Sequence, residues 1–466
     1  MTRSSVVPSS RRSAQLRRSF VRDYPAAVRG EGVYLWDSVG HRYLDFSGSA
    51  AVNFIGHGVR EVASAMARQA EELEFVHSSQ FVTPLAEEFA REVLEFAGPH
   101  FRGGRVYFCC GGSEAVETAL KLARQYQVEI GEERRYRILS RRQAYHGATL
   151  GALAVSGNRR RRNLYLPMVR QMRSYEHIGL PYCYRCKYKC HSCARQYAEE
   201  LEHAVEMSHG SAAAFICEPL SGATLGAAVP PAGYLRRISE ICSREGLLLI
   251  ADEVMAGFGR TGRNFAVDHW RVHPDILVCG KGIASGYAPL GAVIVTRKVA
   301  DAIARGSGAF VHGFTYNAHP VALAAGRAVL RRIRTQRLVK AADGDRRPSA
   351  AAHLERALET LLECRSVGDV RGLGLLWGVE FVSDKRSKRP FPVARNFAGR
   401  VAKAAAARGL MVYPMQGCVD GIAGDHLLLA PPAIITSRQI IWAVNQLRHA
   451  IAEAERNKPL PLRIPG

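Results

Sequence analysis

From about residue 60 the sequence alternates short apolar runs with longer amphipathic stretches, and this alternation limits the possible folds more than any other feature. The runs are continuously apolar, as expected for strands that are buried on both faces. Stretches such as Glu61–Glu72 and Pro84–Phe96 have the spacing of helices. Alternating helices and strands predict an α/β fold with a mostly parallel sheet. The runs are Val106–Cys110, Ile138–Leu139, Ala214–Cys217, Leu247–Ala251, Ile276–Cys279 and Ala292–Val295.

The length of the chain predicts more than one domain. It has 466 residues, and a single hydrophobic core usually stops growing at about 250–300 residues. A hairpin is expected at Gly32–Asp37 and Gly40–Phe46, where two alternating runs flank a turn. We expect an N-terminal arm (1–22), an N-terminal part of a small domain (23–60), a large domain (61–325) and a C-terminal small domain (326–466).

The composition is that of a globular protein, with 47% hydrophobic and 23% charged residues. No apolar run approaches the ~18–20 residues that cross a bilayer. The net charge of +22 leaves nucleic-acid binding as an alternative. The basic residues are mostly arginines spread along the chain, without interleaved aromatic residues. These features favour a cytoplasmic protein with no nucleic-acid or membrane partner.

The N-terminus is basic and contains Arg17-Arg18-Ser19-Phe20-Val21, which resembles a twin-arginine signal. No apolar segment follows it, so export is not expected. A cleaved organellar leader remains an alternative, because residues 1–22 contain no acidic residue.

The chain has 11 cysteines, an odd number that argues against a disulfide scaffold. Seven are scattered and suggest small buried thiols in a reducing compartment. The other four fall in an expected insertion at 181–195, with His191 among them. Four thiolates could form a tetrahedral zinc site. A loop with reduced thiols or a local disulfide is the alternative. The clustered residues are Cys183, Cys186, Cys190 and Cys193.

Polar residues follow several of the apolar runs, at the sheet edge where α/β proteins bind ligands. Gly111-Gly112-Ser113-Glu114 follows the first run and opens an expected helix at Ala115–Tyr126. Glycines allow close approach of the backbone, and a helix N-terminus attracts anions. The pattern predicts a phosphate site, with a simple Gly-Gly-Ser helix cap as the alternative.

Two further runs end in charged residues. Asp252-Glu253 follows one run, and carboxylates at a buried strand end need a positive partner. Lys281 follows another run, between Gly280 and Gly282. It is either a reactive amine that can bond to a carbonyl or a lysine in a surface turn. The acids are either functional or part of a structural ion pair.

Two more runs end near side chains that could face the same ligand. Tyr145-His146-Gly147 provides an aromatic ring that can stack on a flat heterocycle, and Glu218 follows the run at Ala214–Cys217. Together these groups describe a flat, phosphorylated, carbonyl-bearing heterocycle with a cationic ring nitrogen. Pyridoxal phosphate has all of these properties.

Over residues 30–450 the sequence resembles the class III, fold-type I aminotransferases, which depend on pyridoxal phosphate. The most specific match is the string from Asp252 to Gly262, followed by Gly-Lys-Gly. The fold implied by the resemblance is a large domain with a mostly parallel seven-stranded sheet between helices, plus a smaller α+β domain. The other matching motifs are Gly111–Ala115, Tyr145–Gly147, Gly280–Gly282, Gly313–Tyr316 and Val370–Gly374.

The resemblance also implies roles for individual residues. Lys281 would bond to the cofactor, and Asp252 would pair with its ring nitrogen. Thr315 would reach the phosphate from the neighbouring subunit, which implies a homodimer with a shared site. The remaining cofactor-binding residues would be Gly112 and Ser113 at the phosphate, Tyr145 and Val254 on the two ring faces, and His146 and Glu218 around them.

The implied reaction is transfer of an amino group from an amine or ω-amino donor to a keto acid such as pyruvate, by a ping-pong mechanism. An aminomutase, a decarboxylating transaminase or a racemase is the alternative within the family. A basic nucleic-acid-binding protein that uses the cysteine cluster is a more distant alternative.

Positions where relatives carry a carboxylate-binding arginine are neutral here, at Ala148, Tyr413 and Leu428. We therefore expect a donor without an essential α-carboxylate, or an ω-amino compound held by another cation. The run Arg159–Arg162 is a candidate for that cation, and a solvated basic loop is the alternative. Ala50, where some amine transaminases have a bulky tryptophan, suggests room for a larger substituent on the substrate. At Met255 many relatives have a glutamine that contacts the ring hydroxyl of the cofactor, so that contact is not expected here.

Overall fold

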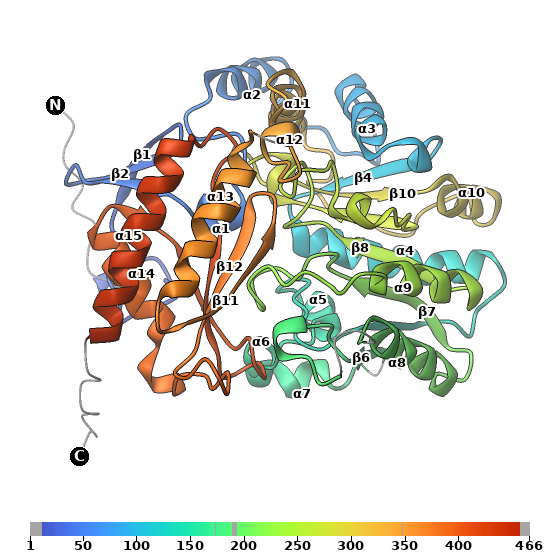
Figure 1. The fold of residues 1–466 in the computed structure, drawn as a ribbon. Coiled ribbons are helices and arrows are strands. Elements are labelled where there is room, and N and C mark those ends of the chain that lie inside the picture. Colours follow the sequence, from blue (N-terminus) through green and yellow to red (C-terminus); the bar gives the residue numbers. More distant parts are fainter. Residues whose placement is uncertain (1–11, 173, 189–192, 347, 457–466) are drawn as a thin grey trace.

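The computed structural model describes residues 12–172, 174–188, 193–346 and 348–456 and has one large and two smaller sheets (Figure 1). The large sheet has seven strands, and only β10 runs antiparallel to its neighbours, β4 and β9. In order across the sheet, the strands are β4 (Arg105–Cys109), β10 (Gly291–Val295), β9 (Ile276–Cys279), β8 (Leu248–Asp252), β7 (Ala212–Cys217), β5 (Arg137–Arg141) and β6 (Tyr175–Ile178).

The apolar runs became the strands of this sheet. Every residue of β7, β8, β9 and β10 is buried, as continuous apolar runs predict. The sequence did not predict β6, whose sequence Tyr-Glu-His-Ile is polar in the middle. It lies at the edge of the sheet and is mostly half-buried, so it needs no continuous apolar run.

Two four-stranded sheets lie beside the large one (Figure 1). The expected hairpin is confirmed as an antiparallel pair, and its second strand also pairs in parallel with a strand near the C-terminus. One sheet has the order β1 (Ala27–Glu31), β2 (Tyr34–Asp37), β3 (Arg42–Asp45) and β13 (Leu410–Met411). The other has the order β11 (Val367–Leu373), β12 (Leu376–Phe381), β15 (Asp425–Leu429) and β14 (Tyr413–Gln416).

Helices cover the sheets, and the three helices expected at Glu61–Glu72, Pro84–Phe96 and Ala115–Tyr126 are present. The helix after β4 contacts five strands of the large sheet. The α-helices are α1 (Gly48–Ala51), α2 (Arg60–Glu72), α3 (Pro84–Ala97), α4 (Gly112–Glu129), α5 (Leu150–Val155), α6 (Arg159–Arg162), α7 (Leu166–Val169), α8 (Cys193–Met207), α9 (Tyr234–Arg244), α10 (Arg297–Arg305), α11 (Pro320–Thr335), α12 (Leu338–Ala341), α13 (Ala350–Glu359), α14 (Phe397–Ala407) and α15 (Ser437–Arg456).

The architecture confirms the expected fold class: a mixed α/β fold with a mostly parallel seven-stranded sheet and a smaller sheet domain. The expected boundary at residue 325 falls inside α11, a continuous helix that packs against α2 and α3. The exact domain boundaries stay a prediction.

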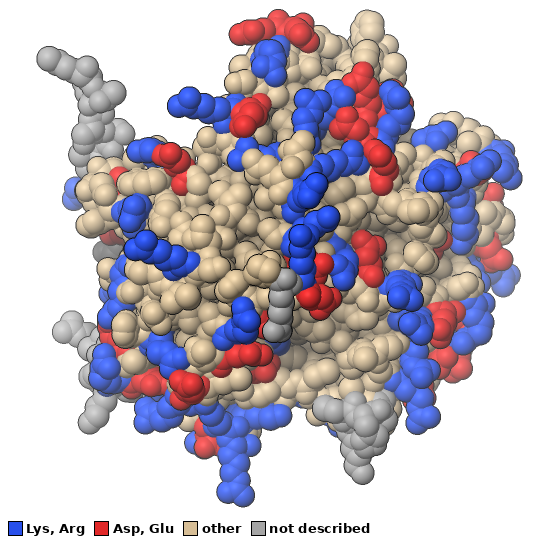
Figure 2. All heavy atoms as spheres, turned by 45° about the horizontal axis from the view of Figure 1, so that its top comes forward, with Lys and Arg blue, Asp and Glu red and all other residues tan. Residues whose placement is uncertain are grey.

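On one face of the molecule (Figure 2), charged residues are distributed rather than gathered in one place. On the face shown in Figure 2, Lys and Arg side chains are interspersed with acidic and uncharged residues. Among the described residues, no helix has the length and apolar character that spanning a membrane requires.

The cysteine-rich insertion is only partly described. Cys183 and Cys186 lie at or beside a short 3₁₀ helix (Cys183–Arg185), and Cys193 begins α8. The prediction for Cys190, like the nearby His191, falls outside the described residues. In the part of the chain that the structure covers, no three potential ligands come together at a metal-sized site. The zinc hypothesis therefore gains no support.

Side chains of the insertion bind a buried carboxylate of the small domain. Glu380 on β12 is fully buried and accepts hydrogen bonds from the Tyr182 hydroxyl and from Arg185 Nε, the latter at 2.7 Å. Arg371 lies 3.0 Å from its other oxygen. Burial alone would raise the pKa of Glu380, but the two arginines hold it below its usual value. Glu380 therefore connects the insertion to the sheet formed by β11, β12, β15 and β14.

Replacing Glu380 by glutamine should lower the free energy of unfolding by about 3–5 kcal/mol, because it removes the buried carboxylate that pairs with both Arg185 and Arg371. Arg371 keeps its second pair, with Asp369 at 2.7 Å, so Arg185 loses more. Urea unfolding at pH 7 measures this change. The lowered pKa of Glu380 means that its contribution is lost as the pH falls through its folded-state pKa, so the difference from wild type should shrink in acid.

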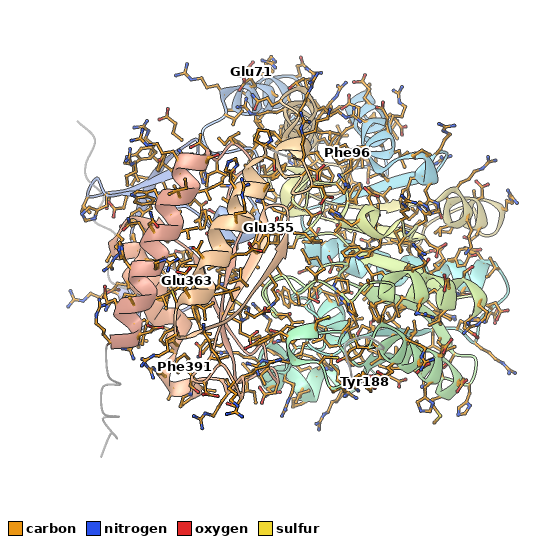
Figure 3. All side chains as sticks on the ribbon, in the orientation of Figure 1. Glu71, Phe96, Tyr188, Glu355, Glu363 and Phe391 are labelled. Atoms are coloured by element: carbon orange, nitrogen blue, oxygen red, sulfur yellow. The ribbon has the colours of Figure 1, made fainter. Side chains whose placement is uncertain are left out.

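Glu363→Gln is the matched control. Glu363, labelled in Figure 3, pairs with Arg448 at 2.9 Å, but its side chain is 73% exposed. An exposed pair contributes about 0–1 kcal/mol. Equal effects of the two substitutions would contradict the structural role of Glu380.

Candidate active site

A cavity of about 270 Å³ lies where strands of the large sheet end, beside the start of α4. Its lining contains all of the predicted catalytic and cofactor-binding residues except Thr315, so the sheet brings together groups that are far apart in the sequence. Thr315 lies in an exposed turn outside this cavity. The lining residues are Arg18, Ala50, Gly112, Ser113, Tyr145, His146, Gly147, Arg161, Glu218, Leu220, Ala223, Asp252, Val254, Met255, Lys281 and Tyr413.

The start of α4 forms one wall of the cavity. Gly112 has no room for a side chain, because a Cβ atom there would lie 2.9 Å from Cγ1 of Val254. In the described part of the chain no side chain caps this helix, so its first N–H groups remain available to an anion. Ser113 Oγ adds a hydroxyl group and accepts a hydrogen bond from the Ala148 N–H at 3.0 Å.

Asp252 lies at the carboxyl end of β8 and is only 5% exposed. Its Oδ2 is 2.7 Å from Nδ1 of His146, and its Oδ1 accepts a hydrogen bond from the Val254 N–H at 3.1 Å. The His146 backbone is in turn held by a 2.8 Å hydrogen bond to Ser156 Oγ. The sequence predicted that His146 belongs to the site but not which residue it contacts. In the structure its ring contacts the Asp252 carboxylate.

The neighbouring carboxyl group, Glu253, does not line the cavity. Its Oε1 accepts a hydrogen bond from the Val267 N–H at 2.9 Å. Burial raises the pKa of Glu253 to about 8. Of the two acids that follow the apolar run, only Asp252 is therefore available to a ligand.

Lys281 follows β9, and it is one of the residues that line the cavity. Desolvation lowers the pKa of its amine, and the charges of Asp252 and Glu218 oppose this shift only in part. A lowered pKa increases the fraction of neutral, nucleophilic amine. The φ angle of 43° at Lys281 is unusual for a residue other than glycine, and such backbone conformations are often found at functional sites.

Tyr145 and Glu218 also line the cavity. Glu218 Oε2 accepts a hydrogen bond from the Tyr145 N–H at 3.3 Å, and its Oε1 accepts one from the Gly222 N–H at 2.9 Å. Burial raises the pKa of Glu218, although the nearby His146 opposes the shift. These contacts fix the backbone that carries the Tyr145 ring.

Two charged residues of the cavity were not predicted individually, and neither were the apolar residues Leu220 and Ala223. Arg161 was one of four candidates in a basic run, and its guanidinium carbon lies 4.4 Å from the centre of the Tyr145 ring. Arg18 comes from the segment expected to be a loose arm, and no sequence pattern related it to the sheet. An apolar wall completes the cavity, with Leu220, Ala223 and Met255 among its members.

Comparisons with known proteins agree with this geometry. The family model for class III aminotransferases matches residues 20–451. The chain is 36% identical over 437 residues to the Bacillus subtilis protein described as uncharacterized aminotransferase YodT, covering 93% of this chain and 96% of that one. It is 34% identical over 430 residues to an adenosylmethionine-8-amino-7-oxononanoate aminotransferase of Geobacter sulfurreducens, covering 91% of each chain.

Solved structures give the same result. An aminotransferase of Bacillus anthracis superposes with a TM-score of 0.87 at 32% identity, covering 96% of this chain and 97% of that one. A thermostable (S)-enantioselective omega-transaminase from Thermomicrobium roseum superposes with a TM-score of 0.83 at 35% identity, covering 93% of each chain. The chain therefore belongs to the class III aminotransferases.

Proposed function

We propose that the protein transfers an amino group from an amine or ω-amino donor to a keto acid such as pyruvate, with pyridoxal phosphate in the cavity described above. One observation carries the proposal: the Lys281 amine, the Asp252 carboxylate and the N-terminus of α4 face a single cavity. Omega-transaminases among the similar structures support an amine or ω-amino donor.

The residues that line the cavity suit the phosphate, the ring, the ring nitrogen and the aldehyde of pyridoxal phosphate. The N-terminus of α4, with Gly112 and Ser113, would hold the phosphate, because backbone N–H groups and a hydroxyl bind anions. The side chains of Tyr145 and Val254 would enclose the ring. Lys281 would bond to the aldehyde carbon. When bound, the cofactor supplies an electron sink that makes the Cα–H bond of an amine acidic.

The role of Asp252 would be to keep a proton on the ring nitrogen. A carboxylate about 4 Å from a cation stabilises it by roughly 4 kcal/mol at an effective dielectric constant near 20. His146, 2.7 Å from Oδ2, would fix the orientation of the carboxylate. Glu218 would act more indirectly, by holding the backbone of Tyr145.

Lys281 would also move a proton. Its amine would take the proton from Cα of the bound substrate amine as a general base and later donate that proton back to the substrate–cofactor carbon framework as a general acid. The lowered pKa of Lys281 favours this role, because a group that shuttles protons works best when both of its protonation states are accessible.

We also propose that two copies of the chain form the complete site. The exposed position of Thr315, outside its own subunit's cavity, is compatible with a contribution to the neighbouring subunit. Closed pairs with two-fold symmetry are the commonest assemblies of identical chains.

The first experiment incubates the purified protein and pyridoxal phosphate with butan-1-amine and pyruvate. We expect alanine and butanal in equal amounts, with the parallel double-reciprocal plots of a ping-pong mechanism. Borohydride reduction should attach the cofactor to residue 281, and Lys281→Ala should abolish both results. Release of CO₂, or turnover without a keto acid, would instead indicate one of the other class III reactions.

Asp252→Asn should lower kcat by about 10³-fold, because roughly 4 kcal/mol of stabilisation is lost and each 1.4 kcal/mol corresponds to a factor of about ten. Steady-state rates with the same substrates measure the change. Glu253→Gln is the matched control, since Glu253 is adjacent in sequence but outside the cavity. An Asp252→Asn enzyme within threefold of wild type would contradict the proposed role.

The shared site can be tested by mixing two inactive variants. Thr315→Glu would repel the phosphate, and Lys281→Ala removes the reactive amine. In a mixed dimer, one of the two sites would combine an intact Lys281 with an intact Thr315. Co-expression should therefore restore activity that neither variant has alone. Full activity of Thr315→Glu alone, or no recovery in the mixture, would contradict the proposal.

A further inference from the structure

The four arginines of α6 have different environments, and only one of them lines the active-site cavity. Arg159 and Arg160 are exposed, and Arg160 donates a hydrogen bond to Gln416 Oε1 at 2.9 Å. Arg162 is half-buried, and burial, together with the nearby charge of Arg170, lowers its pKa. Arg161 alone belongs to the cavity lining. The run is therefore not a uniform solvated loop.

Arg161 is held in place at its backbone and at its guanidinium group. Its backbone N–H donates a hydrogen bond at 3.2 Å to the side chain of Asn158, which caps α6. Its guanidinium group lies over the Tyr145 ring, with the carbon 4.4 Å from the ring centre. Stacking on an aromatic face orients the planar group and leaves its N–H edges available.

The charge of Arg161 is not balanced by the protein residues around it. Among the described residues its side chain forms no ion pair. The two acids of the cavity are already engaged, Asp252 by His146 and Glu218 by two backbone N–H groups. The positive charge of Arg161 instead opposes protonation of Lys281. A cation without a counter-ion in a partly enclosed cavity is suited to bind an anion.

We propose that Arg161 binds the carboxylate of the substrates: that of the keto-acid acceptor and that of a donor whose acidic group is separate from its reacting amine. The proposal rests on the proposed aminotransferase function and specifies its substrate class. The planar guanidinium group can form two parallel hydrogen bonds with a carboxylate. Arg18, the other arginine of the lining, is exposed and lies on the N-terminal segment, so it is less firmly positioned.

The test compares two donors of equal chain length, 4-aminobutanoate and butan-1-amine, in the wild-type holoenzyme and in Arg161→Met. We expect the KM for 4-aminobutanoate and for pyruvate to rise about 10- to 100-fold, as for the loss of a hydrogen-bonded charged pair. The KM for butan-1-amine should stay within about threefold. Arg161→Lys should fall between the two, because it keeps the charge but loses the planar geometry.

Arg160→Met is the matched control, since it removes the same charge from the same helix outside the cavity. It should leave the preference between the two donors unchanged. Equal loss for both donors in Arg161→Met would overturn the proposal and indicate a role in positioning Tyr145. A weaker affinity for pyridoxal phosphate with an unchanged donor preference would overturn it in favour of a cofactor contact.

A binding measurement separates this proposal from the reaction itself. Butanoate, which has no amine to react, should bind the wild-type holoenzyme in calorimetry about 10- to 100-fold more tightly than it binds Arg161→Met. Butanamide should bind the two proteins equally. If neither donor reacts with the wild-type enzyme, the proposed function fails, but the butanoate affinities still decide the role of Arg161. Equal affinities would overturn the role.

Discussion

The contact between Asp252 and His146 is the interaction on which the site depends. A carboxylate at the end of a buried strand loses most of its hydration, so the protein must provide other partners for it. His146 and the Val254 N–H provide them at 2.7 and 3.1 Å. These contacts connect the end of β8 to the loop after β5, and that loop also carries the Tyr145 ring. The same interaction therefore stabilises the acid and aligns two walls of the cavity.

Much of this arrangement could be predicted from the sequence, because the sheet imposes strong requirements. Continuous apolar runs mark strands that are buried on both faces, and the residue after each run that forms a parallel strand must then lie at the ligand-binding edge. Gly112 and Lys281 stood out because each is unusual at its position: one lacks the space for a side chain, and the other is a cation at the end of an apolar strand. Local requirements of this kind restrict the residue type at a position, so they can be recognised from the sequence.

The features that the sequence did not predict depend on tertiary contacts. Strand β6 is an edge strand, so its polar residues give no periodic signal. Arg161 differs from Arg159 and Arg160 only in the direction that a short helix gives its side chain. Arg18 reaches the cavity from a segment without apolar periodicity. Positions of this kind are determined by the packing of the whole chain, which no local pattern encodes.

The parallel pairing of β3 with β13 places Leu44 beside Leu410, although more than three quarters of the chain's length separates them in sequence. During synthesis the ribosome releases the N-terminal hairpin long before its partner strand exists. One edge of β3 therefore has unsatisfied backbone groups while the seven-stranded sheet is being made, and unpaired edges of this kind promote aggregation. The nascent chain is therefore prone to aggregate through this edge until β13 has been synthesised and can pair with β3.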